Sequence, residues 1–235
     1  MNTVSDQSSM EERLIGHLAA DLAPVRPLAP PVLRALGWLA VVAATAVALA
    51  SFADLAALWH RLAGATDLWI AVLGSAATAI LAAIAAFELS LPDARRAWAL
   101  LPVPAALLWI GASGFGCLRT WLAPDTHVAD MSEARDCLMF IVGLSVPLSA
   151  LLIMMLRRAC SLQPGLTAAI AGLAVAAAAA TLLNFFHPFD AAATDLAVHA
   201  GAVALVIGAN RAFSGRLLAP NFLRADVTGL RPRAN

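Results

Sequence analysis

The sequence predicts an all-α fold: an integral membrane six-helix bundle preceded by a short cytoplasmic amphipathic helix. The 235 residues are 61% hydrophobic and only 13% charged, with a mean hydropathy of +0.82. A soluble domain has about a quarter of its residues charged. The apolar residues form runs of about the 20 residues that cross a bilayer as a helix. Because none of these runs alternates as a barrel strand does, helices must satisfy the backbone within lipid.

The first element is a polar lead at residues 10–31, the only continuous aqueous segment long enough to fold into a recognition element. Apolar residues in it recur at helical spacing, so the lead predicts a short amphipathic helix. Ser9 stands three residues before Glu12, which is the capping-box spacing, and Pro24 and Pro27 stop the helix. Its apolar positions are Leu14, Ile15, Leu18 and Leu22, and its polar positions are Glu11, Glu12, Arg13, His17 and Asp21.

A helix of about four turns is marginal alone in water, so its leucine face is expected to order against a partner. Helices that lie on a membrane surface are usually rich in Lys and Arg, whereas acidic residues outnumber Arg13 here. We therefore favour a protein partner over a lipid surface. A helix packed on its own bundle, or a frayed terminus, is the third alternative.

Six membrane-spanning helices are expected next, at residues 32–52, 68–89, 98–118, 137–156, 166–186 and 191–213. Gly and Ala positions in the fifth and sixth helices allow close packing of helices. The chain then has three parts: a cytoplasmic N-terminal segment at residues 1–31, a six-helix transmembrane domain at residues 32–213 and a cytoplasmic tail at residues 214–235.

Arginine predicts the orientation, because loops on the cytoplasmic side carry an excess of Lys and Arg. With both ends inside, the cytoplasmic side holds twelve of the fifteen arginines and the opposite side holds Arg61, Arg119 and Arg135. Both termini are therefore expected in the cytoplasm. The twelve cytoplasmic arginines are Arg13, Arg26, Arg34, Arg95, Arg96, Arg157, Arg158, Arg211, Arg216, Arg224, Arg231 and Arg233.

Cys117 and Cys137 bracket the longest outer connection, between the third and fourth spans. A disulfide that closes a loop of this size contributes about 3 kcal/mol. His187 and His199 are expected at the same level, so the two cysteines and two histidines could instead hold a zinc-like ion. We favour a structural or redox-active cysteine pair, because the spacing matches no standard zinc motif. Cys160 lies on the cytoplasmic side and cannot pair with either.

Catalytic motifs are missing from the sequence: it has no Ser/His/Asp order, Gly-rich phosphate loop, HExxH or CxxC. We therefore expect no enzyme activity, no cofactor and no direct binding of nucleic acid. A small metal or solute transporter remains the alternative function. Asn184 and His199 are the strongly polar side chains that we identify within the spans, too few for a convincing ion path.

Eight short motifs are spread over nearly the whole chain in a fixed order on the predicted six-span scaffold. They are DLAPVRPL at residues 21–28, WALLP at 98–102, GC at 116–117, Cys137, LSVP at 144–147, RR at 157–158, HPFDA at 187–191 and HAGA at 199–202. In these motifs the chain resembles the family of negative regulators of sigma F (NrsF), which are proteobacterial six-span proteins.

The resemblance implies a membrane-bound anti-sigma factor whose N-terminal segment sequesters an extracytoplasmic-function sigma factor until stress releases it. The sigma factor and the lipid bilayer are then its partners. The residues expected to bind the sigma factor are Leu14, Ile15, Leu18, Asp21 and Leu22. The family associates two periplasmic cysteines with redox or heavy-metal stress, and Cys117 and Cys137 occupy the matching positions. The resemblance gives Cys160 no role.

Overall fold

The computed structural model describes residues 3–20, 27–64, 66–122, 131–159, 161–185 and 193–218. These residues form helices and their connections, with no strand among them, which confirms the predicted all-α class. The helices are α1 (Thr3–Ala20), α2 (Pro31–Ala50), α3 (Leu55–Gly64), α4 (Thr66–Leu89), the 3-10 helix η1 (Arg96–Leu100), α5 (Val103–Leu122), α6 (Met131–Leu156), α7 (Pro164–Leu183) and α8 (Ala193–Leu218).

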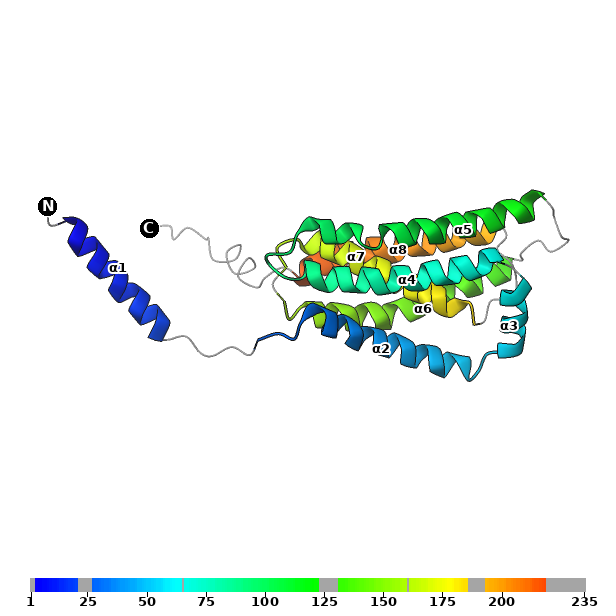
Figure 1. The fold of residues 1–235 in the computed structure, drawn as a ribbon, viewed down its shortest axis with the longest axis horizontal. Helices are drawn as coiled ribbons and strands as arrows, with labels where there is room; N and C mark the ends of the chain where they lie inside the picture. Colours follow the sequence, from blue (N-terminus) through cyan, green and yellow to red (C-terminus); the bar gives the residue numbers. More distant parts are fainter. Residues whose placement is uncertain are drawn as a thin grey trace, which may run out of the picture.

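Helices α2 and α4 to α8 run side by side along one axis, while α1 lies apart from them (Figure 1). The centre of the bundle is α7, which packs against α4, α6 and α8. Alanine is the commonest residue of α7, and its residues 174–180 are all buried. Small side chains let neighbouring backbones approach closely, so an alanine-rich helix suits this central place.

Five helical segments are long and apolar enough to cross a membrane, and each overlaps one of the first five predicted spans. They are Pro31–Ala50, Leu68–Leu89, Arg96–Phe115, Leu138–Leu156 and Pro164–Leu183. The predicted sixth span corresponds to α8, a helix of 26 residues whose described apolar stretch is Ala200–Phe213. The third span differs at its start. It was predicted as one helix from residue 98, but the 3-10 helix η1 and a turn occupy the chain up to Pro102, and α5 begins only at Val103. Pro102 and Pro104 have no backbone N–H, so they cannot donate within a continuous helix but fit the start of a new one.

Two parts of the helix assignment differ from the sequence prediction. Helix α1 begins at Thr3, so Ser9 lies inside it and is not its N-cap. Helix α3 was expected as part of an outer connection; its first turn is capped by Asp54, whose Oδ1 accepts a hydrogen bond from the Ala57 amide at 3.0 Å. Trp59 of α3 meets Trp69 of α4 edge to face, with ring centroids 6.4 Å apart.

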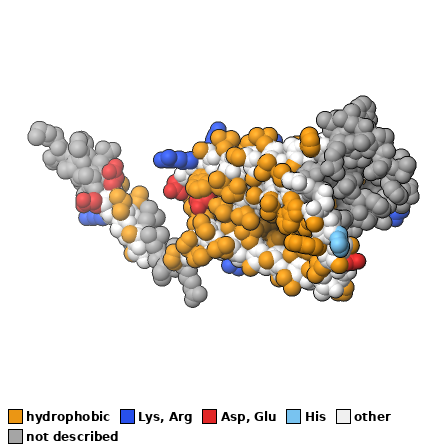
Figure 2. Space-filling view, turned by 45° about the vertical axis from the view of Figure 1, so that its right-hand side comes forward, with side chains coloured by type: hydrophobic (Ala, Val, Ile, Leu, Met, Phe, Trp, Pro, Cys, Tyr) orange, Lys and Arg blue, Asp and Glu red, His pale blue; other side chains and the backbone are white. Residues whose placement is uncertain are grey.

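The face of the bundle seen in Figure 2 is apolar over most of its described length. Charged side chains gather at one end of the bundle, beside this apolar band. Large hydrophobic side chains that point outward occur on five of the helices, and examples are Val47, Leu73, Ile110, Val146 and Leu205, each more than half exposed. An apolar patch of this extent is rare on a soluble monomer, so this surface is suited to lipid.

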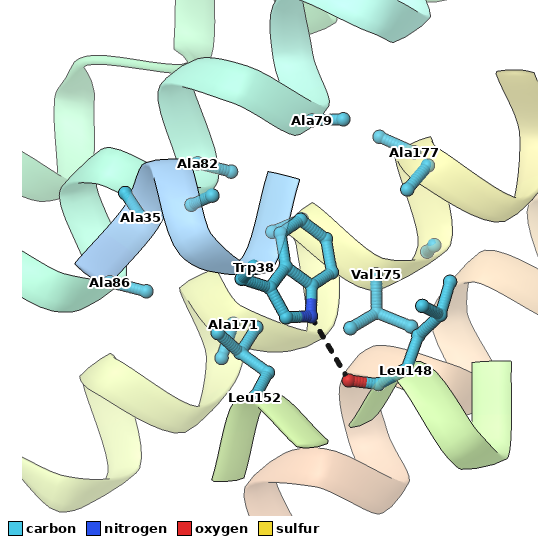
Figure 3. Packing of buried hydrophobic residues seen from close by; sticks show 14 of the residues in the cluster. Ala35, Trp38, Ala79, Ala82, Ala86, Leu148, Leu152, Ala171, Val175 and Ala177 are labelled. Carbon is cyan, nitrogen blue, oxygen red and sulfur yellow. Dashed lines mark hydrogen bonds between the residues drawn. The ribbon is translucent and has the colours of Figure 1, made fainter. Parts of the chain in front are cut away.

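Trp38 is the largest fully buried side chain of the core and joins α2 to α6 (Figure 3). Its ring lies among small side chains of α4 and α7, and its Nε1 donates a hydrogen bond to the Leu148 carbonyl at 3.2 Å. A buried indole N–H needs such an acceptor, because leaving it unpaired would cost roughly 1–3 kcal/mol. The bond therefore fixes how α2 sits on α6.

Gly172 is a point where α7 and α8 approach closely. A Cβ at this position would lie 2.8 Å from the Ile207 Cα and 3.1 Å from the Asn210 Cβ. Because the first of these atoms belongs to the backbone, a side chain could be accommodated only by moving a helix. The glycine is therefore required by the helix packing.

We expect Gly172→Ala to lower the melting temperature of the purified protein in detergent, since forcing an extra methyl group into a packed core costs typically 1–3 kcal/mol. The matched control is Gly143→Ala in α6, where an added Cβ would meet nothing within 4 Å. This control should leave the melting temperature unchanged or raise it, because alanine favours a helix by roughly 1 kcal/mol over glycine. Equal melting temperatures for the two variants would contradict the packing role of Gly172.

Candidate functional site

The first candidate site is the apolar face of α1. Leu14 is 61% exposed, Ile15 is 64% exposed and Met10, one turn before Leu14, is 72% exposed. Leu18 lies in α1 one turn after Leu14, and its side chain is outside the described part of the structure. Asp21 and Leu22 also lie outside the described residues. Met10 extends the apolar face, and its i, i+4 relation to Leu14 was visible in the sequence.

The predicted cysteine pair lies on α5 and α6, two helices that follow one another in the chain. Cys117 is in the last two turns of α5, and Cys137 is in the second turn of α6. The end of α5 and the start of α6 lie at the far end of the bundle from the start of α2 (Figure 1). We call these the cysteine end and the Arg34 end.

A disulfide or a metal site at the cysteine end remains a prediction. The side chains of Cys117, Cys137 and His199 are outside the described part, as are His187 and Cys160 entirely. His199 lies in α8, in the second turn of that helix. Within the residues that the structure describes, no group of three or more His, Cys, Asp or Glu side chains could hold a metal ion.

The Arg34 end contains a polar joint that the sequence analysis did not identify. Arg34, in the first turn of α2, is only 8% exposed. Its guanidinium donates hydrogen bonds to the Ser90 Oγ at 3.4 Å and to the Met155 carbonyl, and it lies 4.8 Å from the centre of the Phe87 ring. The joint therefore connects the start of α2 to the ends of α4 and α6.

The chemistry of this joint follows from the helix ends that it contacts. The last carbonyls of a helix have no intrahelical donor and carry partial negative charge. A guanidinium that binds them supplies the missing N–H donors and a positive charge. Ser90 in turn donates to the Phe87 carbonyl at 2.6 Å. The planar guanidinium can also stack on the Phe87 ring while its N–H groups bind elsewhere.

A second set of hydrogen bonds secures the last carbonyl of α4 beside the joint. The Leu89 carbonyl accepts from Ser161 Oγ and from Thr167 Oγ1, each at 3.1 Å. The two hydroxyls lie 2.9 Å apart, and both residues are buried. The connection between α6 and α7 is thus fixed to the end of α4, which holds the surroundings of Arg34 in place.

A third polar contact lies inside the bundle, between α6 and α8. Asn210 is 5% exposed, and its Nδ2 donates to Ser149 Oγ at 3.0 Å and to the Val206 carbonyl at 2.9 Å. From the sequence, only Asn184 and His199 were expected as strongly polar side chains within the spans, and this expectation was wrong, because Asn210 is a third. A hydrogen bond between membrane helices contributes roughly 0.6 kcal/mol on average, which indicates a packing role.

Comparison with known proteins identifies a family. A family model described as negative regulator of sigma F (NrsF) matches residues 18–224, which is most of the chain. The match includes Leu18, Asp21, Leu22 and both cysteines of the predicted pair, and it leaves Leu14 and Ile15 outside. No curated protein and no solved structure gives a significant match.

Proposed function

This chain belongs to the family of negative regulators of sigma F, and from that membership we propose that it is a membrane-embedded anti-sigma factor. It sequesters an extracytoplasmic-function sigma factor at the bacterial inner membrane and releases it under periplasmic redox or heavy-metal stress. It acts by binding a protein and not by catalysing a reaction. The sigma factor and the lipid bilayer are its partners.

The observation that carries this proposal is the exposed apolar face of α1. Leu14 and Ile15 are each more than 60% exposed on a helix that stands apart from the bundle. Burying such a side chain is worth roughly 1.5–3 kcal/mol, so these residues favour a groove on another protein. The acidic residues Glu11 and Glu12 beside them are exposed as well, and they disfavour an anionic lipid surface.

Removal of the chain tests the regulatory role. We expect promoters served by the sigma factor to become active without stress when the coding sequence is deleted, and to return to silence when it is resupplied. The readout is the transcript level of these promoters. Silent promoters in the deletion strain, combined with altered accumulation of metal ions, would contradict the proposal and support a transporter.

The proposed orientation makes a separate prediction. Reporters fused after Arg96, Arg158 or Asn235 are expected to be active in the cytoplasm, and a reporter near Asp125 in the periplasm, because the arginines are concentrated on one side. Alkaline phosphatase and fluorescent protein fusions measure the two locations. A periplasmic C-terminus would contradict an even number of spans and the proposed place of both ends of the chain.

A further inference from the structure

The sigma-binding segment and the cysteine pair lie at opposite ends of the bundle, so a signal between them needs a physical connection. Helix α6 provides one. It has 26 residues, or about 39 Å at 1.5 Å per residue, and runs from the cysteine end to Met155 and Leu156 at the Arg34 end. Helix α5, which carries Cys117, packs mainly against α4.

Two side chains of α2 bind backbone carbonyls of α6. Trp38 donates to the Leu148 carbonyl and Arg34 donates to the Met155 carbonyl. These acceptors are seven residues apart, about two turns, and so are spaced along one side of α6. Both donors are buried, where a hydrogen bond left unpaired is costly. A movement of the last turns of α6 would therefore act on the first two turns of α2, which also pack against α4.

Pro147 divides α6 between the cysteine end and these two acceptors. It lies inside the helix, ten residues after Cys137 and one residue before Leu148. Proline has no N–H, so the Gly143 carbonyl receives no helical hydrogen bond from it, and helices bend most easily at such a position. The part of α6 after Pro147 can thus change its angle to the part before it without loss of a further backbone hydrogen bond.

The first turn of α2 is also where the N-terminal segment joins the bundle. Pro30, which precedes α2, has an extended backbone, and residues 27–30 are exposed. Arg34 is four residues further on. The direction in which the segment leaves the bundle is therefore set by the same turn that Arg34 ties to α6.

We propose that Arg34 and Trp38 are coupling residues: they transmit a change at the cysteine end, through α6 hinged at Pro147, to the presentation of the sigma-binding segment. This inference rests on the proposed function and adds the route of regulation to it. Arg34 and Trp38 do not touch the sigma factor or the stress signal; they position α2. Loss of either hydrogen bond leaves α2 attached to α6 by the other one alone, which weakens the coupling.

The test uses the full chain in its native membrane, with Arg34→Gln and Trp38→Phe as variants. Phenylalanine keeps an aromatic ring at the buried position but is smaller than tryptophan and has no N–H to donate. In both variants, promoter activity without stress is expected to stay within about threefold of the wild type. The induction of the promoters by cadmium or diamide is expected to fall at least tenfold. A tenfold loss corresponds to about 1.4 kcal/mol of coupling. The matched control is Thr45→Val, which removes a hydrogen bond within α2, to the Val41 carbonyl, and should induce normally.

A second measurement separates transmission from sensing. Maleimide labelling of Cys117 and Cys137 after stress should be the same in the two variants as in the wild type, because the cysteine end is unchanged. Normal induction in both variants would overturn the inference, as would loss of repression in unstressed cells while the protein still reaches the membrane. If promoters ignore deletion of the wild-type chain, the proposed function itself fails, which is a distinguishable result.

Discussion

Replacement of both Leu14 and Leu18 by aspartate is expected to activate the sigma-dependent promoters in unstressed cells. The two residues stand one turn apart on α1, and Leu14 is 61% exposed in the absence of a partner. An apolar anchor of a helix that binds a groove contributes roughly 1.5–3 kcal/mol. The double substitution should therefore weaken binding of the sigma factor by about a hundredfold or more.

The control for this double variant places the same two charges on the opposite side of α1. Gly16→Asp with Ala20→Asp keeps the spacing of four residues, and both positions are exposed. This control should keep the promoters silent. Transcript levels measure both variants, and immunoblots of membranes verify that each protein is inserted. If the promoters respond equally to the two variants, the apolar face of α1 is not the binding surface.

Replacement of both Cys117 and Cys137 by serine is expected to abolish the response of the promoters to oxidants and thiophilic metals. Two thiols at the ends of α5 and α6 can form or lose a disulfide, or bind one metal ion together, and serine can do neither. Such a change would alter how the two helices pack at the cysteine end. The promoters should then stay in one state, whatever the concentration of cadmium or diamide.

Cys160→Ser is the matched control for the cysteine pair, because we place Cys160 at the opposite side of the membrane. It should respond to stress as the wild type does. The measurement is the ratio of transcript levels with and without stress, with the amount of membrane-inserted protein held equal. If the double-serine variant responds to stress normally, Cys117 and Cys137 only stabilise the outer connection. His187 and His199 would then be the next residues to test.

The helices of the bundle could be predicted from sequence because lipid imposes a single requirement on each span. About 20 apolar residues must follow one another, and this pattern is visible without knowledge of any contact. Helix α3 was missed for the same reason: its ten residues are too few to span, and Trp59, His60 and Arg61 interrupt their apolar character. The start of α1 was missed because residues 3–9 are polar and carry no apolar period.

The polar joint could not be predicted because its partners are distant in the sequence. Arg34 binds groups that lie 56 and 121 residues further along the chain. In the sequence it counted only as one more positive charge at the start of a span. The available signal was its position, four residues after Pro30 and within an apolar run. Burial of an arginine there is costly unless its guanidinium finds hydrogen-bond acceptors. The pairing of Trp38 with Leu148 has no local signal at all.

The measurement that tests the central claim most directly is co-purification of the tagged full chain with its partner from solubilised membranes of unstressed cells. The account predicts that mass spectrometry finds an extracytoplasmic-function sigma factor in near-equal amount with the chain. It also predicts that this factor disappears when α1, residues 3–20, is deleted. A chain that carries no sigma factor, or one that retains the factor in full without α1, would contradict the claim.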